Sequence, residues 1–88
     1  MATTFPLGMC VMTCGARDAL PPWFIADSFA RHAAGDWGTL CDEDRKANED
    51  ALKHGDRILS KYNFEGEDLY VLTEADRSIT TALLTSEY

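Results

Sequence analysis

The sequence predicts an α+β fold, in which a three- to four-stranded antiparallel sheet carries two helices on one face. Two segments in the first 55 residues repeat apolar residues at helical spacing. Three later segments alternate apolar and polar residues with the period of two that is typical of strands. The 88 residues suffice for a single domain, residues 1–88, with one thin core. The expected order of elements is β-α-α-β-β-β.

The first predicted element is a short buried strand over residues 9–13. This run is apolar or compatible with a strand throughout, and Gly15 stops it. One helical turn over residues 16–20 is expected to follow, because the prolines at positions 21 and 22 interrupt any longer helix.

The first long helix is predicted over residues 23–33. Apolar residues recur there every four positions from Ile25 to Ala33, which gives the helix one apolar face. Pro22 suits the first turn, where its missing N–H has no helical partner in any case. Gly35 is expected to end the helix in a left-handed conformation.

A second helix is predicted to begin near Asp42 and to end at Gly55. Thr39 resembles a helix cap, and the acidic residues 42–44 are favourably placed at the positive end of the helix dipole. One side of this helix is expected to face the core through four residues: Leu40, Ala47, Ala51 and His54.

Three strands are predicted over residues 57–62, 68–73 and 78–84. The linkers at residues 63–67 and 74–77 are short and polar, which favours hairpin connections. These strands are therefore expected to pair as an antiparallel meander.

The negative charge of the chain lies almost entirely in its C-terminal half. Residues 1–41 carry three acidic and two basic residues, a net of −1, whereas residues 42–88 carry twelve and six, a net of −6. A protein with one strongly negative side is repelled by nucleic acid and anionic membranes and is steered toward basic protein surfaces. The alternative is that these acids only keep the protein soluble. The candidate partner-binding residues are ten acids of this half: Asp42, Glu43, Asp44, Glu49, Asp50, Glu65, Glu67, Asp68, Glu74 and Asp76.

The three cysteines, Cys10, Cys14 and Cys41, are an odd number, and no basic leader or apolar stretch of ~20 residues accompanies them. We expect reduced thiols in a cytoplasmic protein. A metal site is not expected, because Cys10 and Cys14 lack the second ligand pair of a zinc site. No cofactor is predicted, and cysteine catalysis is disfavoured because an acidic chain raises thiol pKa values.

Common catalytic motifs are absent from the sequence, which has no glycine-rich phosphate loop, no G-x-S-x-G and no H-E-x-x-H. Within residues 31–38, His32 and Asp36 could form an acid–base pair or part of a recognition loop. The favoured interpretation is structural: His32 bonds the last carbonyls of its helix, and Trp37 anchors the loop in the core. We therefore do not expect an enzyme.

A second polar cluster spans residues 74–78. Asp76 and Ser78 are typical turn residues, and Arg77 can bond nearby carbonyls, so a hairpin turn is the favoured interpretation. The alternative is a recognition tip beside an acidic patch.

Five segments resemble a group of short proteins encoded by phages, plasmids and integrative elements. The segments are R-H-A-A-G-D-W-G (31–38), N-E-D-A-L (48–52), R-I-L-S-K-Y (57–62), T-E-A-D-R-S-I-T-T-A-L-L (73–84) and the closing S-E-Y. The resemblance covers about residues 9–88, and some members are labelled type I restriction subunits. No adenosylmethionine-binding glycine motif or methylase tetrapeptide supports that label here.

Size, acidity and this resemblance together imply an anti-CRISPR protein or a related anti-defence inhibitor that acts on a type I surveillance complex. Such a complex holds DNA in grooves lined by lysine and arginine, where phosphate neutralisation supplies much of the affinity. Clustered carboxylates can occupy such a groove in place of DNA, although a net charge of −7 is small beside a DNA segment. Exposed aromatic or methionine side chains are expected to supply the rest of the interface.

The alternative function is that of a non-inhibitory accessory protein of a phage or plasmid, which binds an element-encoded partner. A third hypothesis, a small enzyme, requires His32 and Asp36 to converge in a pocket. In both binding hypotheses the protein is taken to be a monomer, and its partner is a protein rather than nucleic acid or a membrane.

Overall fold

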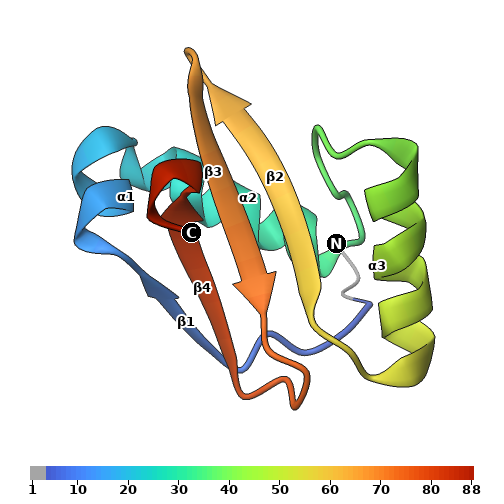
Figure 1. Ribbon diagram of the computed structural model, residues 1–88. Coiled ribbons are helices and arrows are strands. Elements are labelled where there is room, and N and C mark those ends of the chain that lie inside the picture. Colours follow the sequence, from blue (N-terminus) through green and yellow to red (C-terminus); the bar gives the residue numbers. More distant parts are fainter. Residues whose placement is uncertain (1–3) are drawn as a thin grey trace.

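Four strands form one sheet in the computed structural model, which describes residues 4–88 and confirms the α+β class (Figure 1). The strands lie in the order β1-β4-β3-β2. The last three strands of the chain form the predicted antiparallel meander. The bounds are β1 Met9–Met12, β2 Ile58–Phe64, β3 Glu67–Thr73 and β4 Ile79–Leu84.

The first strand, β1, corrects two expectations. It pairs with β4 in parallel, with Met9 opposite Ile79 and Met12 opposite Ala82, so the sheet is mixed rather than fully antiparallel. It is also not buried, because Met9 is 67% exposed and Met12 is 48% exposed. The pattern of residues 9–13 indicates a strand, but its direction and burial depend on a neighbour that is distant in the sequence.

Three helices and a short 3-10 helix complete the chain, one helix more than expected. The additional helix begins earlier than the predicted turn because the Thr13 hydroxyl accepts a hydrogen bond from the N–H of Ala16 (3.0 Å). The bounds are α1 Cys14–Ala19, α2 Pro22–Ala33, α3 Asp42–His54 and η1 Thr85–Glu87.

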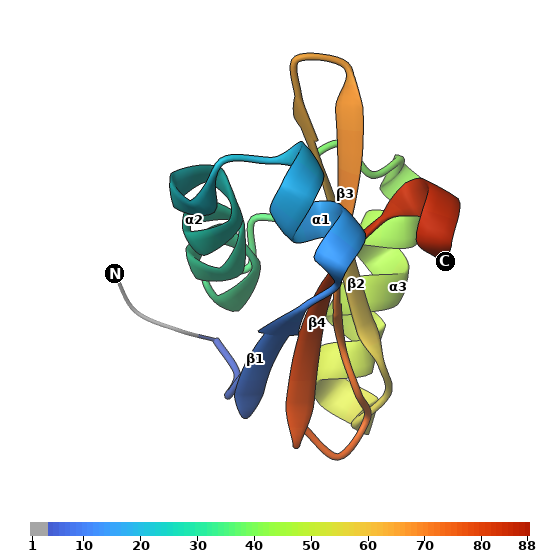
Figure 2. The same cartoon turned by 90° about the vertical axis from the view of Figure 1, so that its left-hand side faces the viewer.

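The two long helices take different positions around the sheet (Figure 2). Whereas α2 lies over one face and contacts β2 and β3, α3 packs along the β2 side and contacts the sheet mainly through that strand. The pair of helices expected on one face is thus divided between a face and an edge. Among residues 4–88, only η1 lies over part of the opposite face, which is turned to the viewer in Figure 1.

The termini of α2 agree with the sequence. Prolines at positions 21 and 22 start the helix, and Gly35 follows its end with a φ of +84°. The N–H of Gly35 donates to the His32 carbonyl (3.1 Å), and the N–H of Asp36 donates to the Arg31 carbonyl (2.9 Å). These bonds satisfy two of the carbonyls that the end of the helix leaves free.

The bounds of α3 also agree with the sequence, but its cap does not. Cys41 occupies the cap position and makes no side-chain capping bond. The predicted cap, Thr39, instead donates its N–H (2.8 Å) and its hydroxyl (3.3 Å) to the Lys61 carbonyl. Gly55 ends the helix with a φ of +75°, as predicted.

The buried side of α3 is narrower than its periodicity predicts. Asn48 and Ala51 are the buried residues, whereas Ala47 and His54, both expected in the core, are exposed. A helix that packs against the edge of a sheet buries a smaller stripe than one that lies across its face.

Two apolar clusters form the core. Trp37 is 3% exposed and belongs to the second of them, which confirms that it anchors the loop between the long helices. The first cluster contains Ala16, Leu20, Phe24, Ile25, Tyr62, Leu69, Val71 and Ala82. The second contains Phe5, Trp37, Ala51 and Ile58.

Hydrogen bonds from a side chain and a loop close the outer edge of β2. An edge strand presents alternate N–H and C=O groups that have no neighbouring strand. The side chain of Asn48 takes the place of a neighbouring strand at Leu59. Its amide oxygen accepts from the N–H of Leu59 (3.1 Å), and its amide nitrogen donates to the Leu59 carbonyl (2.7 Å). Two residues further, Lys61 donates its N–H to the Trp37 carbonyl (3.2 Å) and accepts from Thr39.

Gly38 allows the loop to approach β2 this closely. Its φ is +75°, and a Cβ at this position would overlap the carbonyl oxygen of Lys61. Gly38 is therefore required for the approach of this loop to the edge of the sheet.

We expect Asn48→Ala to lower the free energy of unfolding by about 1–3 kcal/mol, because Leu59 then loses the partner of both its backbone groups. Urea unfolding followed by circular dichroism measures the change. Asp50→Ala, at an exposed position of the same helix, is the matched control because it brings a similar gain in helix propensity without touching β2. Equal stabilities of the two variants would contradict the role of Asn48.

Candidate protein-binding face

The uncovered face of the sheet is the candidate functional site, and we call it the open face. Residues that lie opposite one another in adjacent strands point to the same side of a sheet, so the register defines this face. It comprises eleven side chains: Met9 and Val11 of β1, Ile79, Thr81 and Leu83 of β4, Asp68, Tyr70 and Leu72 of β3, and Leu59, Lys61 and Asn63 of β2.

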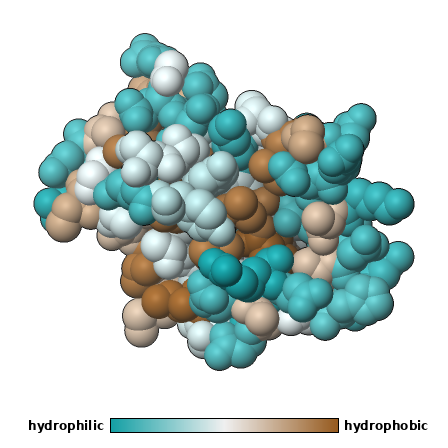
Figure 3. Space-filling model, in the orientation of Figure 1, coloured by the Kyte–Doolittle hydropathy of each residue, from teal (hydrophilic) through white to brown (hydrophobic). Residues whose placement is uncertain are grey.

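An apolar band crosses the middle of the open face. Val11, Thr81, Leu72 and Leu59 lie opposite one another in successive strands and form one row across the whole sheet. Leu72 is 8% exposed, and the other three are half-buried. Figure 3 shows hydrophobic surface at the centre of this side of the molecule and again toward β1. No helix of residues 4–88 crosses the band, and three of its four side chains stay partly in contact with solvent.

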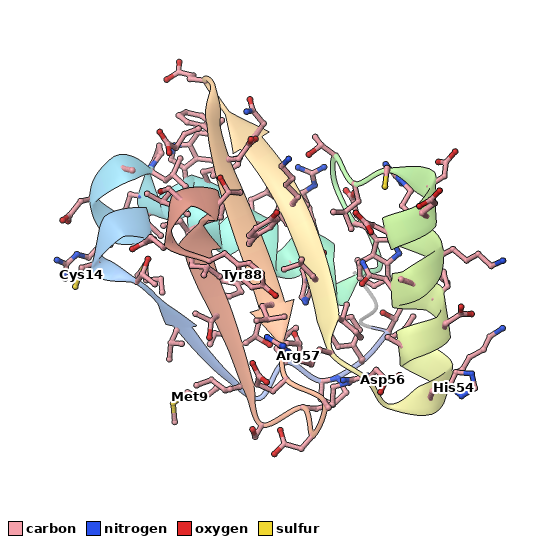
Figure 4. The ribbon with its side chains drawn as sticks, in the orientation of Figure 1. Met9, Cys14, His54, Asp56, Arg57 and Tyr88 are labelled. Carbon is pink, nitrogen blue, oxygen red and sulfur yellow. The ribbon has the colours of Figure 1, made fainter. Side chains whose placement is uncertain are left out.

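Two strongly exposed side chains border the band. Met9 is 67% exposed and Tyr88 is 66% exposed. The ring of Tyr88 packs edge-on against Tyr70, with 5.2 Å between the ring centroids. In Figure 4, Tyr88 lies over the sheet, and Met9 points away from the end of β1. Methionine and tyrosine are typical contact residues of protein-binding surfaces.

The charged side chains on this side of the sheet pair with one another. Arg57 Nε lies 3.5 Å from Glu74 Oε1 at one end of the face, and Lys61 Nζ lies 3.8 Å from Asp68 Oδ2 toward the other. Figure 4 places Arg57 near the lower end of β3. Such exposed pairs add little stability. Their four charges cancel, however, so the apolar band has no net charge beside it on the sheet.

A hollow of about 240 Å³ lies between α3 and β2, next to the apolar band. Drug-sized ligands occupy pockets of roughly 300–1,000 Å³ that enclose them, so this open hollow suits a single side chain of a partner better than a free small molecule. Three apolar residues, one amide, one acid and one base line it: Leu40, Ala47, Leu59, Asn48, Asp44 and Arg57.

The ten predicted partner-binding acids fall into three separate groups. The β2–β3 hairpin and the β3–β4 turn lie at opposite ends of the sheet, so the ten do not form one continuous patch (Figure 1). The groups are Asp42, Glu43, Asp44, Glu49 and Asp50 on α3, Glu65, Glu67 and Asp68 at the hairpin, and Glu74 and Asp76 at the turn.

Four of these acids already have partners within the protein. Glu49 accepts a hydrogen bond from Trp37 Nε1 (2.8 Å), Asp76 accepts from Ser78, and Asp68 and Glu74 form the ion pairs described above. Within residues 4–88, the other six make no ion pair or side-chain hydrogen bond, and four of them belong to α3: Asp42, Glu43, Asp44 and Asp50. The helix beside the open face therefore holds the largest group of acids available to a partner.

The β3–β4 turn is the hairpin turn predicted for residues 74–78. Arg77 has a φ of +61°, and its guanidinium donates to the carbonyls of Glu74 (3.1 Å) and Asp56 (2.7 Å). Hydrogen bonds from Ser78 to the carboxylate of Asp76 lower the pKa of that acid. The cluster has a structural role in the turn, and its role in recognition stays a prediction.

His32 belongs to a buried chain of hydrogen bonds. Its side chain is fully buried, with Nδ1 2.5 Å from Ser60 Oγ and Nε2 2.9 Å from Thr73 Oγ1. Thr73 Oγ1 lies 2.7 Å from Thr80 Oγ1, which donates to the Leu7 carbonyl (2.7 Å). The prediction that His32 bonds carbonyls of its own helix is wrong, because the ring points into the sheet, where three hydroxyls replace apolar side chains.

The direction of each bond in this chain follows from its last member. Thr80 uses its single hydroxyl proton on Leu7, so its oxygen accepts the proton of Thr73. The oxygen of Thr73 then accepts the N–H of His32 Nε2, and Nδ1 accepts the proton of Ser60. The chain is thus fully satisfied by a neutral imidazole that is protonated on Nε2.

Asp36 does not converge with His32. Its carboxylate is exposed and accepts from Arg31 Nε (2.7 Å) and from the N–H of Gly38 (3.1 Å). The bond from Arg31 is the main cause that lowers the pKa of Asp36. Because both ring nitrogens of His32 are occupied in the core, the two residues do not share the pocket that the enzyme hypothesis requires.

The cysteines form no cluster. Cys10, Cys14 and Cys41 are free and exposed, and partial burial raises the pKa of the Cys10 thiol. Within residues 4–88, no three His, Cys, Asp or Glu side chains are grouped so that they could hold a metal ion. In the same part of the chain, no helix combines the length and apolar character needed to cross a membrane.

The apolar band is not among the residues that the sequence predicts for binding. A signal for it exists in β3, where Leu69, Tyr70, Val71 and Leu72 make both sides of the strand apolar. Two apolar sides require two covering layers, and residues 4–88 supply one helical layer. Comparisons with protein-family models, with curated proteins and with solved structures find no match to this chain.

We expect the stability of the protein to fall as the pH is lowered from about 6.5 to 4. Burial, assisted by the charge of Arg77, lowers the pKa of His32 from 6.5 to about 4, so the unfolded chain binds more protons than the folded one in this window. The stabilisation is complete above pH 6.5, and about 3 kcal/mol of it is lost near pH 4.

Urea unfolding at a series of pH values tests this expectation. His32→Gln should flatten the slope of the unfolding free energy between pH 6.5 and 4, whatever its effect on stability at neutral pH. His54→Gln, which replaces an exposed histidine at the end of α3, is the matched control and should retain the slope. A slope that His32→Gln leaves unchanged would contradict the buried neutral imidazole.

Proposed function

We propose that this protein is a non-catalytic binding protein that docks through its open face, together with α3, onto a basic surface of a partner protein. The proposed partner is a host nucleic-acid-handling defence complex, a type I CRISPR effector, whose DNA binding the protein inhibits. One observation carries the proposal: an apolar band on an uncovered sheet face lies beside the largest group of unpaired acids.

The apolar band supplies the part of the interface that charge cannot. Each Å² of apolar surface removed from water contributes about 25 cal/mol, and exposed apolar patches with a polar rim are typical of protein interaction sites. Met9 and Tyr88 extend this surface beyond the band and are already positioned at the face. A partner that covers the band therefore gains affinity that does not depend on salt.

The acids of α3 orient the protein toward a basic surface of the partner. With a net charge of −7, the protein is attracted to a surface rich in lysine and arginine, such as a groove that otherwise holds DNA. The carboxylates of Asp42, Glu43 and Asp44 project from the first turn of the helix, where no basic residue pairs with them within residues 4–88. A basic groove that runs along α3 would place the neighbouring surface of the partner over the open face.

The hollow between α3 and β2 links these two parts of the proposed interface. Leu40 and Leu59 provide apolar walls, and Asp44 contributes an acid to the lining. An apolar anchor from the partner, flanked by lysine or arginine, satisfies both the walls and the acid. The same surface would serve an accessory protein that binds an element-encoded partner, so the two functions differ in the partner rather than in the site.

Thr81→Glu tests the open face. It places a charge in the middle of the apolar band, and we expect binding to a purified type I effector to weaken at least about tenfold, the loss typical of a disrupted contact centre. Surface plasmon resonance measures the affinity, and a mobility-shift assay measures whether the effector still binds its DNA target.

Ala26→Glu is the matched control, since it adds the same charge at an exposed position of α2, on the other side of the sheet. Binding that Thr81→Glu and Ala26→Glu weaken equally would contradict the open face as the site. If the unmodified protein fails to bind the effector at low salt, the CRISPR proposal is wrong. Specific binding of an element-encoded protein that depends on Thr81 would then support the accessory function.

Neutralising the acids of α3 tests their role. We expect the triple variant Asp42→Asn, Glu43→Gln, Asp44→Asn to slow association and to reduce the salt dependence of binding, because rim charges act mainly on the association rate. The double variant Glu65→Gln, Glu67→Gln at the distant hairpin is the control. A larger effect of the hairpin variant would move the acidic contact away from α3.

A further inference from the structure

The two edges of the sheet differ in a way that the proposed function does not use. The outer edge of β2 is closed by Asn48 and by the loop around Gly38. Figure 2 shows β1 at the other edge, nearest the viewer, with no element in front of it among residues 4–88. Its residues carry none of the devices that protect edge strands, which are charged side chains, proline and bulges.

Backbone geometry shows which groups of β1 are open. The N–H of Met9 donates to the Ser78 carbonyl and the N–H of Thr13 donates to the Ala82 carbonyl, both at 3.0 Å. Because alternate residues of a strand turn their backbone groups to opposite sides, the N–H and C=O of Cys10 and Met12 point away from β4. These four groups have no neighbouring strand within residues 4–88.

The charge distribution favours a second copy of this chain as the strand that pairs there. Two molecules with a net charge of −7 repel each other. Residues 4–16 contain no charged side chain, whereas the acids of the C-terminal half lie mainly on α3 and at both hairpin turns. Contact through β1 therefore keeps the acidic sides of the two copies apart. It also uses the open edge of each copy, so the assembly closes as a dimer rather than growing into a fibre.

We propose that two copies of this protein form a dimer by antiparallel pairing of their β1 strands. This pairing must meet two conditions. Side chains of the two copies that belong to one face must lie on the same side of the joined sheet. The open backbone groups of Cys10 and Met12 must face those of the second copy. Both conditions are met when Val11 lies opposite Val11 of the second copy. Cys10 then lies opposite Met12 of the second copy, and the four open backbone groups of each strand are paired.

The two-fold axis of this dimer is perpendicular to the sheet. Both open faces consequently lie on the same side, and the two four-stranded sheets become one sheet of eight strands. The apolar band continues from one copy to the other through the two Val11 side chains. Met12, which is 48% exposed and lies on the other side of the sheet, is next to Cys10 of the second copy at the same contact.

Light scattering coupled to size-exclusion chromatography tests the dimer. We expect twice the 9.8 kDa mass of one chain at high protein concentration. Met12→Pro removes an N–H that points away from β4, so it should give the single-chain mass and an unchanged circular dichroism spectrum. Met12→Ala, which keeps that N–H, should remain a dimer. A single-chain mass for the unmodified protein at every concentration would overturn the proposal.

A cross-link tests the register. In the proposed pairing, the two Val11 residues form a non-hydrogen-bonded pair with Cα atoms about 4.5 Å apart, which a disulfide can bridge. Val11→Cys, in a chain whose three cysteines are replaced by serine, should form a covalent dimer on mild oxidation. A dimer that Met12→Pro does not disrupt, or that Val11→Cys does not cross-link, overturns this pairing.

The dimer stands or falls independently of the proposed function, because the two associations respond to salt in opposite ways. Salt screens the repulsion between two acidic copies and should strengthen the dimer, whereas it should weaken binding to a basic partner. Sedimentation at low and high salt therefore separates failure of one proposal from failure of the other.

Discussion

The buried chain of hydrogen bonds from His32 to Leu7 is the constraint on which the rest of the structure depends. It connects α2 to β2, β3 and β4, and through Leu7 to the segment that leads into β1. Each member uses its one proton on the next, so removal of any hydroxyl leaves a buried polar group unpaired at a cost of about 1–3 kcal/mol. The network ties α2 to the sheet, because the imidazole of His32 bonds Ser60 of β2 and Thr73 of β3 at the same time.

This constraint also bears on the open face. Ser60, Thr73 and Thr80 occupy positions on the covered face that would otherwise hold apolar side chains. Apolar residues of the same strands, such as Leu72 and Leu83, point to the other side, where residues 4–88 form no second layer of long helices. The covered side thus combines the apolar core with three buried hydroxyls, and the open side also carries more apolar than polar residues. In most two-layer domains the solvated face of the sheet is polar, and this departure is the physical basis for a binding role.

Local patterns predict the elements of this fold well and their mutual arrangement poorly. The helix that ends at Gly35 and the three strands of the meander follow from periodicity and turn residues. The parallel pairing of β1, the position of α3 at an edge and the partners of His32 depend on contacts between segments far apart in the chain. The same limit applies to the site. The acids of α3 can be identified by charge alone, whereas the apolar band requires knowledge of which side of the sheet α2 covers.

Because the two edges of the sheet differ, the open face can be extended at β1 and not at β2. Asn48 and the loop at Gly38 bond the backbone of Leu59 and Lys61 beside α3, where the acids are gathered, so these positions offer side chains rather than backbone groups. At β1 the reverse holds, because the edge offers backbone groups and no charge. Association through β1 therefore extends the apolar surface without covering it and leaves α3 at both outer ends. A basic partner that binds one copy would then meet a second copy of the same surface, which raises the effective concentration of the site without any new type of contact.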